Sequence, residues 1–264
     1  MVNEIQIRPL LAEDADTIPE LIEAGIRAEV FPLTIFSSDK YYRYIQDRLV
    51  HGTDVAFYGA YRKGKLLGYA EWRYQEENLF LNNIYLAHDS RGNGLGRELF
   101  HQGVHVLSTP NTNHLSLDVF EDNDGAKSWY ERLGFTHHQS SFWHVTKHKK
   151  MNKEKKIAYK VTNLELANKQ HESYGFSMLR IETSHNAYNI GRITNRYFRL
   201  QQENFYDEDL IIALNNLDEK RDLLLISNHP FVEGFELICA SNRMTKSIST
   251  LRGGIYDNQN LGLK

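Results

Sequence analysis

The stretch LFLNNIYLAHDSRGNGLGRELF, Leu79 to Phe100, combines an apolar strand, a glycine-rich turn and the start of a helix. Its turn offers a run of backbone N–H groups with little side-chain bulk, which suits a phosphate at a helix N-terminus. Arg91 and Arg97 add positive charge. The turn lacks the Gly-Lys-Ser/Thr of a Walker loop, and Arg97 stands where a dinucleotide-binding loop would have its third glycine. The stretch therefore predicts a phosphate-binding loop of another kind.

A second motif follows the next apolar strand, and it reads Asn123-Asp124-Gly125-Ala126-Lys127-Ser128-Trp129-Tyr130-Glu131-Arg132-Leu133-Gly134-Phe135. Together, Arg-x-x-Gly-x-Gly and Asn-x-x-Ala-x-x-x-Tyr-x-x-Leu-Gly-Phe resemble the acyl-CoA loop and the tyrosine helix of the GNAT N-acetyltransferase superfamily. The resemblance covers residues 1–147. It implies an α/β (α+β) domain with a mixed central sheet flanked by helices, and acetyl-CoA as the acyl donor.

Apolar periodicity and turn signals place further elements around these motifs. A helix is expected over Glu13–Arg27 and another from Ser37 to His51. Two strands, Val55–Tyr61 and Leu66–Tyr74, are expected to form a hairpin about a glycine-bearing turn. The other expected elements are strands at 4–10, 78–88, 114–120 and 135–145 and helices at 94–107 and 123–133.

The composition and charge of the chain limit the classes of partner that it is expected to bind. The chain has 264 residues, is 41% hydrophobic and carries a formal net charge of −3, which favours a small-molecule acceptor over nucleic acid or an anionic membrane. Its one cysteine, Cys239, excludes an internal disulfide framework. The N-terminus lacks a signal-peptide pattern, and no apolar run is long enough to cross a bilayer. We expect a cytoplasmic protein.

A basic run near the middle of the chain suggests two domains. VTKHKKMNKEKK, residues 145–156, interrupts the apolar pattern, and we interpret residues 148–156 as a linker between domains 1–147 and 157–264. In the second domain Leu223–Ser227, Gly234-Phe235 and a following strand weakly resemble the strand and Gly-Phe of the first. We interpret residues 157–264 as a small α/β domain, a degenerate GNAT-like half that serves acceptor binding or homodimerisation.

The resemblance assigns the acetyl-CoA site residue by residue. The central strand carries it with Ile84, Tyr85 and Leu86, and the backbone at Leu86 polarises the thioester carbonyl. The same strand splays from its neighbour in the family, which exposes backbone groups to the pantetheine arm. The remaining cofactor-binding candidates are Arg91, Gly92, Asn93, Gly94, Leu95, Gly96, Arg97, Asn123 and Tyr130. For Asn123, helix capping is the alternative role.

Direct acetyl transfer to an amine also needs an acid and a base. Tyr130 matches the family tyrosine that returns a proton to the leaving thiolate. The central strand lacks the glutamate that many members carry. Another subgroup carries an acid in the next strand, twelve residues before the tyrosine, and Asp118 matches that position, so the resemblance makes Asp118 the first candidate base, with Glu71 in reserve. Either carboxylate has an alternative structural role, such as pairing with an arginine.

These assignments predict an N-acetyltransferase that acts on a primary amine of an unidentified acceptor. The alternative is a chain that binds acyl-CoA as a sensor or assembly module, which the absence of the central glutamate supports. No metal is expected, because His137, His138, His144 and His148 have neither cysteine nor close carboxylate partners.

Overall fold

A computed structural model describes residues 5–146 and 157–248. The predicted linker, 148–156, lies outside these ranges. Contacts divide the chain into two compact units. The first contains the described parts of Met1–Thr17, Asp47–Gln139 and Asn242–Lys264, and the second contains Ile18–Gln46 and Ser140–Ser241. The predicted division at 147 and 157 stays a prediction, and each unit is described by itself.

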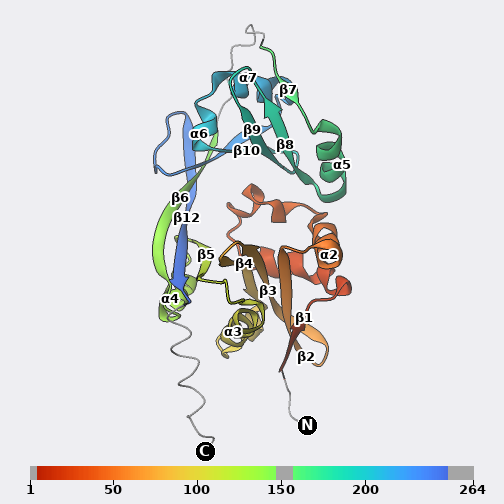
Figure 1. The fold of residues 1–264 in the computed structure, drawn as a ribbon, viewed down its shortest axis with the longest axis vertical. Coiled ribbons are helices and arrows are strands. Elements are labelled where there is room, and N and C mark those ends of the chain that lie inside the picture. The colour runs from red at the N-terminus through yellow and green to blue at the C-terminus, as the bar shows by residue number, and fades with distance from the viewer. Residues whose placement is uncertain (1–4, 147–156, 249–264) are drawn as a thin grey trace, which may run out of the picture. The chain divides into compact units, whose positions relative to one another are not determined.

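The elements are numbered in chain order (Figure 1). The strands are β1 (Ile5–Pro9), β2 (Val55–Arg62), β3 (Lys65–Gln75), β4 (Asn78–Leu86), β5 (His114–Phe120), β6 (Thr136–Thr146), β7 (Lys160–Val161), β8 (Phe176–Glu182), β9 (Ala187–Ile193), β10 (Tyr197–Gln201), β11 (Asp222–Ser227) and β12 (Phe235–Ser247). The α-helices are α1 (Ile18–Glu23), α2 (Tyr41–His51), α3 (Leu95–Leu107), α4 (Asp124–Arg132), α5 (Leu164–Tyr174), α6 (Gln202–Phe205) and α7 (Glu208–Leu217). Short 3₁₀ helices are η1 (Ala12–Thr17), η2 (Phe31–Leu33), η3 (Ile35–Ser37) and η4 (His88–Ser90).

The first unit is built on strands in the order β1-β2-β3-β4-β5-β12-β6. The predicted hairpin is confirmed as β2 and β3, antiparallel about Lys63 and Gly64, whose φ angles of 51° and 79° make the turn. β4 is antiparallel to β3 and parallel to β5, which follows it through the crossover helix α3. The strand between β5 and β6 is the last part of β12, Asn242–Ser247, which lies outside the predicted first domain.

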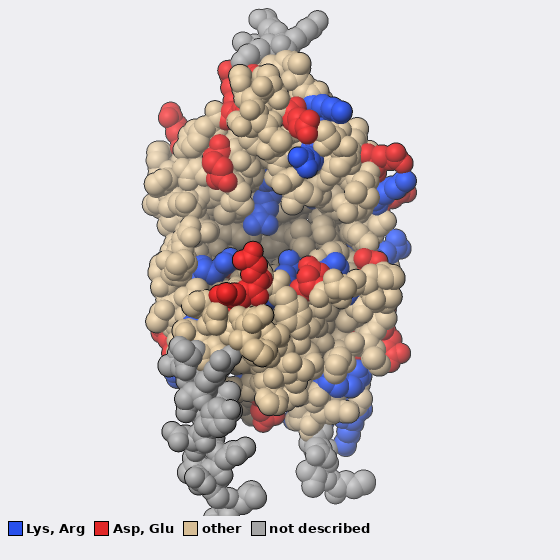
Figure 2. All heavy atoms as spheres, in the orientation of Figure 1, with Lys and Arg blue, Asp and Glu red and all other residues tan. Residues whose placement is uncertain are grey.

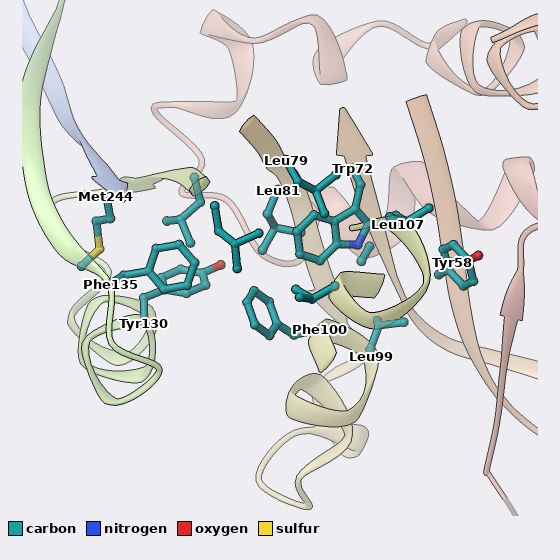
Figure 3. Close-up of a cluster of buried hydrophobic side chains, with 14 of the residues drawn as sticks. Tyr58, Trp72, Leu79, Leu81, Leu99, Phe100, Leu107, Tyr130, Phe135 and Met244 are labelled. Carbon is teal, nitrogen blue, oxygen red and sulfur yellow. The ribbon is translucent and has the colours of Figure 1, made fainter. Parts of the chain in front are cut away.

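The core of the first unit lies between these strands and the helices α3 and α4 (Figure 3). Trp72 of β3 is fully buried against α3, where its ring lies 5.5 Å from that of Phe100. A Cβ at Gly103 of α3 would lie 2.3 Å from Trp72 Nε1, so this helix turn needs glycine to approach the strand. Tyr130 and Phe135 come together at α4, and Met244 of β12 points into the same cluster.

The second unit has the strand order β7-β8-β9-β10-β11-β6-β12, which parallels that of the first unit. Helices α5 and α7 cover one face of β8–β11, and the 3₁₀ segment η2–η3 packs on alternate residues of β10 and β11. This segment is held by Ser38, whose Oγ donates to the Tyr174 carbonyl at 2.6 Å, and by Lys40, whose Nζ donates to the Glu172 carbonyl at 2.9 Å.

Most predicted elements are confirmed within a residue or two, but the helix predicted from Ser37 begins at Tyr41, after the 3₁₀ helix η3. The predicted helix over Glu13–Arg27 begins as η1 and ends at Glu23, with Pro19 in its first turn. The strand predicted after Gly234 begins at Phe235 and continues to Ser247, beyond its predicted end at Ala240. Strands β7, β9 and β10 and helices α5 and α6 were not predicted. Ala167 is the only fully buried residue of α5, so this helix lacks the apolar periodicity from which a helix is predicted.

Candidate acyl-CoA and catalytic site

The site forms where β4 and β5 stop pairing. Their register runs from Asn78–His114 to Leu81–Leu117, although β4 continues to Leu86 and β5 to Phe120. On its other side β4 stays paired with β3 as far as Leu86. The edge of β4 beyond Leu81 therefore presents backbone groups with no strand partner on the β5 side. This is the splay that the resemblance implied, and such groups are suited to hydrogen-bond an extended amide chain.

Two glycines hold Leu86 at the end of the splay. Gly68 is its cross-strand partner, and a Cβ there would lie 2.3 Å from Leu86 Cδ2 and 2.6 Å from the Tyr85 carbonyl oxygen. A Cβ at Gly96 in α3 would lie 3.3 Å from Leu86 Cδ1. Sequence reasoning missed Gly68, although a glycine inside a strand pattern is itself a signal of close backbone approach.

The glycine-rich loop between β4 and α3 has the geometry of an anion site. Gly92 and Gly94 have φ angles of 78° and 80°, and a Cβ on either would meet no atom within 4 Å. Among the described residues, the N–H groups of 92–96 make no hydrogen bond to the chain. Arg91 Nε donates to the Leu86 carbonyl at 3.1 Å, which ties the loop to the end of β4. Successive free N–H groups at a helix start form a concavity for phosphate.

Tyr130 lies on α4 in the core, and 6% of its surface is exposed. Burial raises the pKa of its phenol, and the nearby Tyr85 phenol adds to the shift. Burial also raises the pKa of Tyr85, and the charge of Glu71 adds to this shift. Both phenols are therefore protonated at neutral pH, the state that a general acid requires. Asn123 caps α4, because its Oδ1 accepts the Ala126 N–H at 3.1 Å.

Glu71 is a buried carboxylate on the other face of the sheet, at the bulge between β3 and β4. Its Oε1 accepts two hydrogen bonds of 2.9 Å from Arg73, and its Oε2 accepts one of 2.7 Å from Asn83. The side chain is 1% exposed. Asn83 was not singled out from the sequence, because only the bulge brings it opposite Glu71.

Asp118 is the first residue of β5 beyond the paired register. Both of its carboxylate oxygens accept hydrogen bonds from the Arg243 guanidinium, and this pairing raises the pKa of Arg243. The two residues stand 125 positions apart, so no local pattern points to Arg243 as the partner of Asp118. The catalytic roles of Asp118, Glu71 and Tyr130 stay predictions.

The histidines considered for a metal do not come together. His137 and His138 are exposed on β6, whereas His144 is buried with its Nε2 3.0 Å from Ser227 Oγ and from the His229 carbonyl oxygen. Within 5–146 and 157–248, no group of three or more His, Cys, Asp or Glu side chains is arranged to hold a metal ion. His148 lies outside the described residues.

Two surface properties bear on partners. In the part of the chain that the structure describes, no helix has the length and apolarity to cross a membrane. On the face drawn in Figure 2, basic and acidic side chains are interspersed.

Comparison with known proteins identifies the class. Residues 24–135 match the model of the Acetyltransferase (GNAT) family. This segment, which is less than half of the chain, is therefore similar to GNAT acetyltransferases, the class of acyltransferase that takes its acyl group from acetyl-CoA. The splayed strand, the glycine-rich loop and the tyrosine helix lie within this segment or at its end.

Similar proteins extend the comparison to the whole chain. A 5-NmdU N-acetyltransferase of Pseudomonas phage PaMx11 is 25% identical over 111 residues, 39% of this chain and 77% of that protein. A mycothiol acetyltransferase of Streptomyces griseus subsp. griseus is 31% identical over 93 residues, 34% of this chain and 30% of that protein. A tandem GNAT protein from the clavulanic acid biosynthesis pathway superposes with a TM-score of 0.67 at 12% identity, over 92% of this chain and 98% of that one. At this identity the likeness concerns the fold alone, and the fold of the chain is that of a tandem GNAT protein.

Proposed function

We propose that this protein transfers the acetyl group of acetyl-CoA directly to a primary amine of a small acceptor. The observation that carries the proposal is the splay of β4 from β5, with the free N–H groups of the glycine-rich loop following one strand and Tyr130 following the other. The phage relative is an N-acetyltransferase by name, which supports nitrogen as the acceptor atom.

The reaction follows from these groups. The neutral amine attacks the thioester carbon, and the backbone N–H at Leu86 stabilises the negative charge that develops on the carbonyl oxygen. The C–S bond then breaks, the electron pair leaves on sulfur, and Tyr130 donates its proton to the thiolate. The products are the N-acetyl amine and CoA, and the tyrosinate regains its proton from solvent.

The base must take the proton that the amine loses. We assign this role to Glu71 in preference to Asp118, because Glu71 can accept a proton on Oε2 while Oε1 keeps both bonds to Arg73. Both oxygens of Asp118 are bound to one guanidinium, so protonation there would weaken the ion pair. The burial of Glu71 requires a water molecule between its carboxylate and the amine.

The second half is proposed to carry no CoA site of its own. All five residues of β10 pair with β11, so these parallel strands do not splay, and α6 follows β10 directly without a glycine-rich loop. One CoA per chain is therefore expected from calorimetric titration. Two equivalents would contradict this assignment.

The alternative function is an acyl-CoA sensor or assembly module, and the ion pairing of both candidate carboxylates favours it. Calorimetric titration with CoA and measurements of turnover distinguish the acetyltransferase from the sensor. We expect CoA to bind wild type, and Gly94→Val to weaken binding about 5- to 150-fold, since valine at φ 80° costs about 1–3 kcal/mol. Arg91→Ala should have a smaller effect, because salt screens an exposed charge.

A panel of primary amines is then tested for acceptor-dependent release of the CoA thiol. Release with at least one amine supports the acetyltransferase. Tight CoA binding without release from any amine would favour the sensor, and unchanged CoA affinity in Gly94→Val would refute the loop assignment.

A further inference from the structure

Arg243 of β12 lies near the start of the splay, where Asp118 binds one edge of its guanidinium group and leaves the other edge open. Strand alternation puts Leu117 and Val119 of β5 and Met244 of β12 in the core with α3 and α4 (Figure 3). Asp118 and Arg243 therefore point to the opposite face of the sheet. Phe80 lies on that face too, because the guanidinium carbon of Arg243 is 4.9 Å from the centroid of its ring.

The guanidinium of Arg243 is fixed on one edge and one face. Nε and Nη2 bind the two oxygens of Asp118, the second at 2.9 Å, and the Phe80 ring covers one face of the plane. Nη1 makes no hydrogen bond to any described residue. The side chain is 41% exposed, so the outer edge with Nη1 and Nη2 faces solvent. A planar fork held in this way matches a carboxylate at little entropic cost.

The proposed acetyl-transfer reaction assigns no function to Arg243. Asp118 stands at the first position beyond the β4–β5 pairing, which places Arg243 at the start of the splay, on the stretch of β4 that leads to the thioester position assigned at Leu86. Phe80 is also the cross-strand partner of Arg73. The charge of Arg243 is already balanced by Asp118, which favours a monoanion over a dianion as its ligand.

We propose that Arg243 binds a carboxylate of the acceptor, so that the substrate is an amine that itself carries a carboxylate, of the amino-acid type. Asp118 is then a positioning residue that orients the guanidinium, and it attracts the ammonium form of the incoming amine. This inference rests on the proposed acetyl transfer for its purpose, but the carboxylate subsite is measurable without turnover.

The experiment compares matched ligands on the full-length protein with CoA bound. Amino acids with small, acidic, basic and aromatic side chains are each paired with their C-terminal amides, and binding is measured by saturation-transfer NMR and calorimetry. Phosphoethanolamine serves as the dianionic probe. Variants are Arg243→Gln, Arg243→Lys and Asp118→Asn, and Arg62→Gln is the control, because it removes one exposed positive charge of the same unit. CoA affinity and thermal melting verify that each variant is folded.

At least one amino acid should bind wild type and Arg62→Gln about 10- to 100-fold more tightly than its amide. The preference should vanish in Arg243→Gln and shrink in Arg243→Lys, which keeps the charge without the fork. In Asp118→Asn the affinity should fall while the pH profile of turnover keeps its shape, as expected for positioning and not for proton transfer.

Equal binding of acids and amides, absence of binding by any amino acid, tighter binding of phosphoethanolamine, or a preference that survives Arg243→Gln would overturn the inference. Carboxylate binding that depends on Arg243, without acetylation of any amine, would sustain the subsite and reject the proposed function. Acetylation of neutral amines without any carboxylate preference would sustain the proposed function and reject the carboxylate subsite.

Discussion

The substitution Gly68→Ala, which adds a single methyl group, should test the geometry of the site. In β3 Gly68 faces Leu86, and a Cβ built on it would lie 2.6 Å from the Tyr85 carbonyl oxygen and 3.0 Å from Leu86 Cα. These are backbone atoms of β4, so side-chain rotation does not relieve the contact. Gly68→Ala therefore pushes the splayed end of β4, where we assign the thioester, away from β3.

The size of the effect follows from these distances. Real Cβ atoms essentially never approach within 3.0 Å of another heavy atom, so the oxygen must move by at least about 0.4 Å, the difference between 3.0 and 2.6. Overpacking of this kind costs about 1–3 kcal/mol of folding free energy. A displaced hydrogen bond to CoA loses about 0.5–1.5 kcal/mol, roughly 2- to 12-fold in affinity.

Urea denaturation measures the first quantity, and calorimetric titration with CoA measures the second. The matched control is Gly125→Ala in α4, where the new Cβ would meet only Asn123 Oδ1 at 4.0 Å. Helix propensity makes the control as stable as wild type or more so, with unchanged CoA affinity. If Gly68→Ala showed wild-type stability and wild-type CoA affinity, the close approach of β3 to β4 would be wrong.

Three further perturbations test the catalytic acid, the core and the second unit. Tyr130→Phe should leave CoA affinity within about twofold and lower turnover on the order of 100-fold in steady-state kinetics; unchanged turnover would remove the phenol from the mechanism. Gly103→Ala should lower the free energy of unfolding by about 1–3 kcal/mol, because the Cβ meets three atoms of the buried Trp72 ring under 3.0 Å, and a stabilised variant in urea denaturation would contradict the packing of α3. Burial lowers the pKa of His144, so the stability that neutral imidazole contributes is present above the unfolded pKa of about 6.5 and is lost as pH falls through the folded pKa. Melting temperatures of His144→Asn should then depend less on pH below 6.5 than those of wild type, and parallel curves would exclude this histidine as the cause.

Local chemistry made part of the site predictable from the sequence. Consecutive small residues before a helix favour open backbone N–H groups, and the N–H groups of 92–96, which make no hydrogen bond among the described residues, lie in this glycine-rich turn. The hairpin, the crossover helix and the cap at Asn123 are likewise set by residues close together in the sequence. Such features depend on short-range sterics and hydrogen bonds, which a sequence pattern records directly.

Tertiary structure alone decided which partners the charged groups have and which strands share a sheet. Periodicity predicts that Asp118 lies in a strand, but it predicts neither a strand at Arg243 nor that β12 lies beside β5 and brings the two residues together across 125 positions. The bulge that joins Asn83 to Glu71, and the closeness of Gly68 to Leu86, likewise arise only when the strands pair. Strand pairing between distant segments is fixed by the burial of whole faces and not by any local signal, so the ion pairs and the second half's share of the sheet had to be seen in three dimensions.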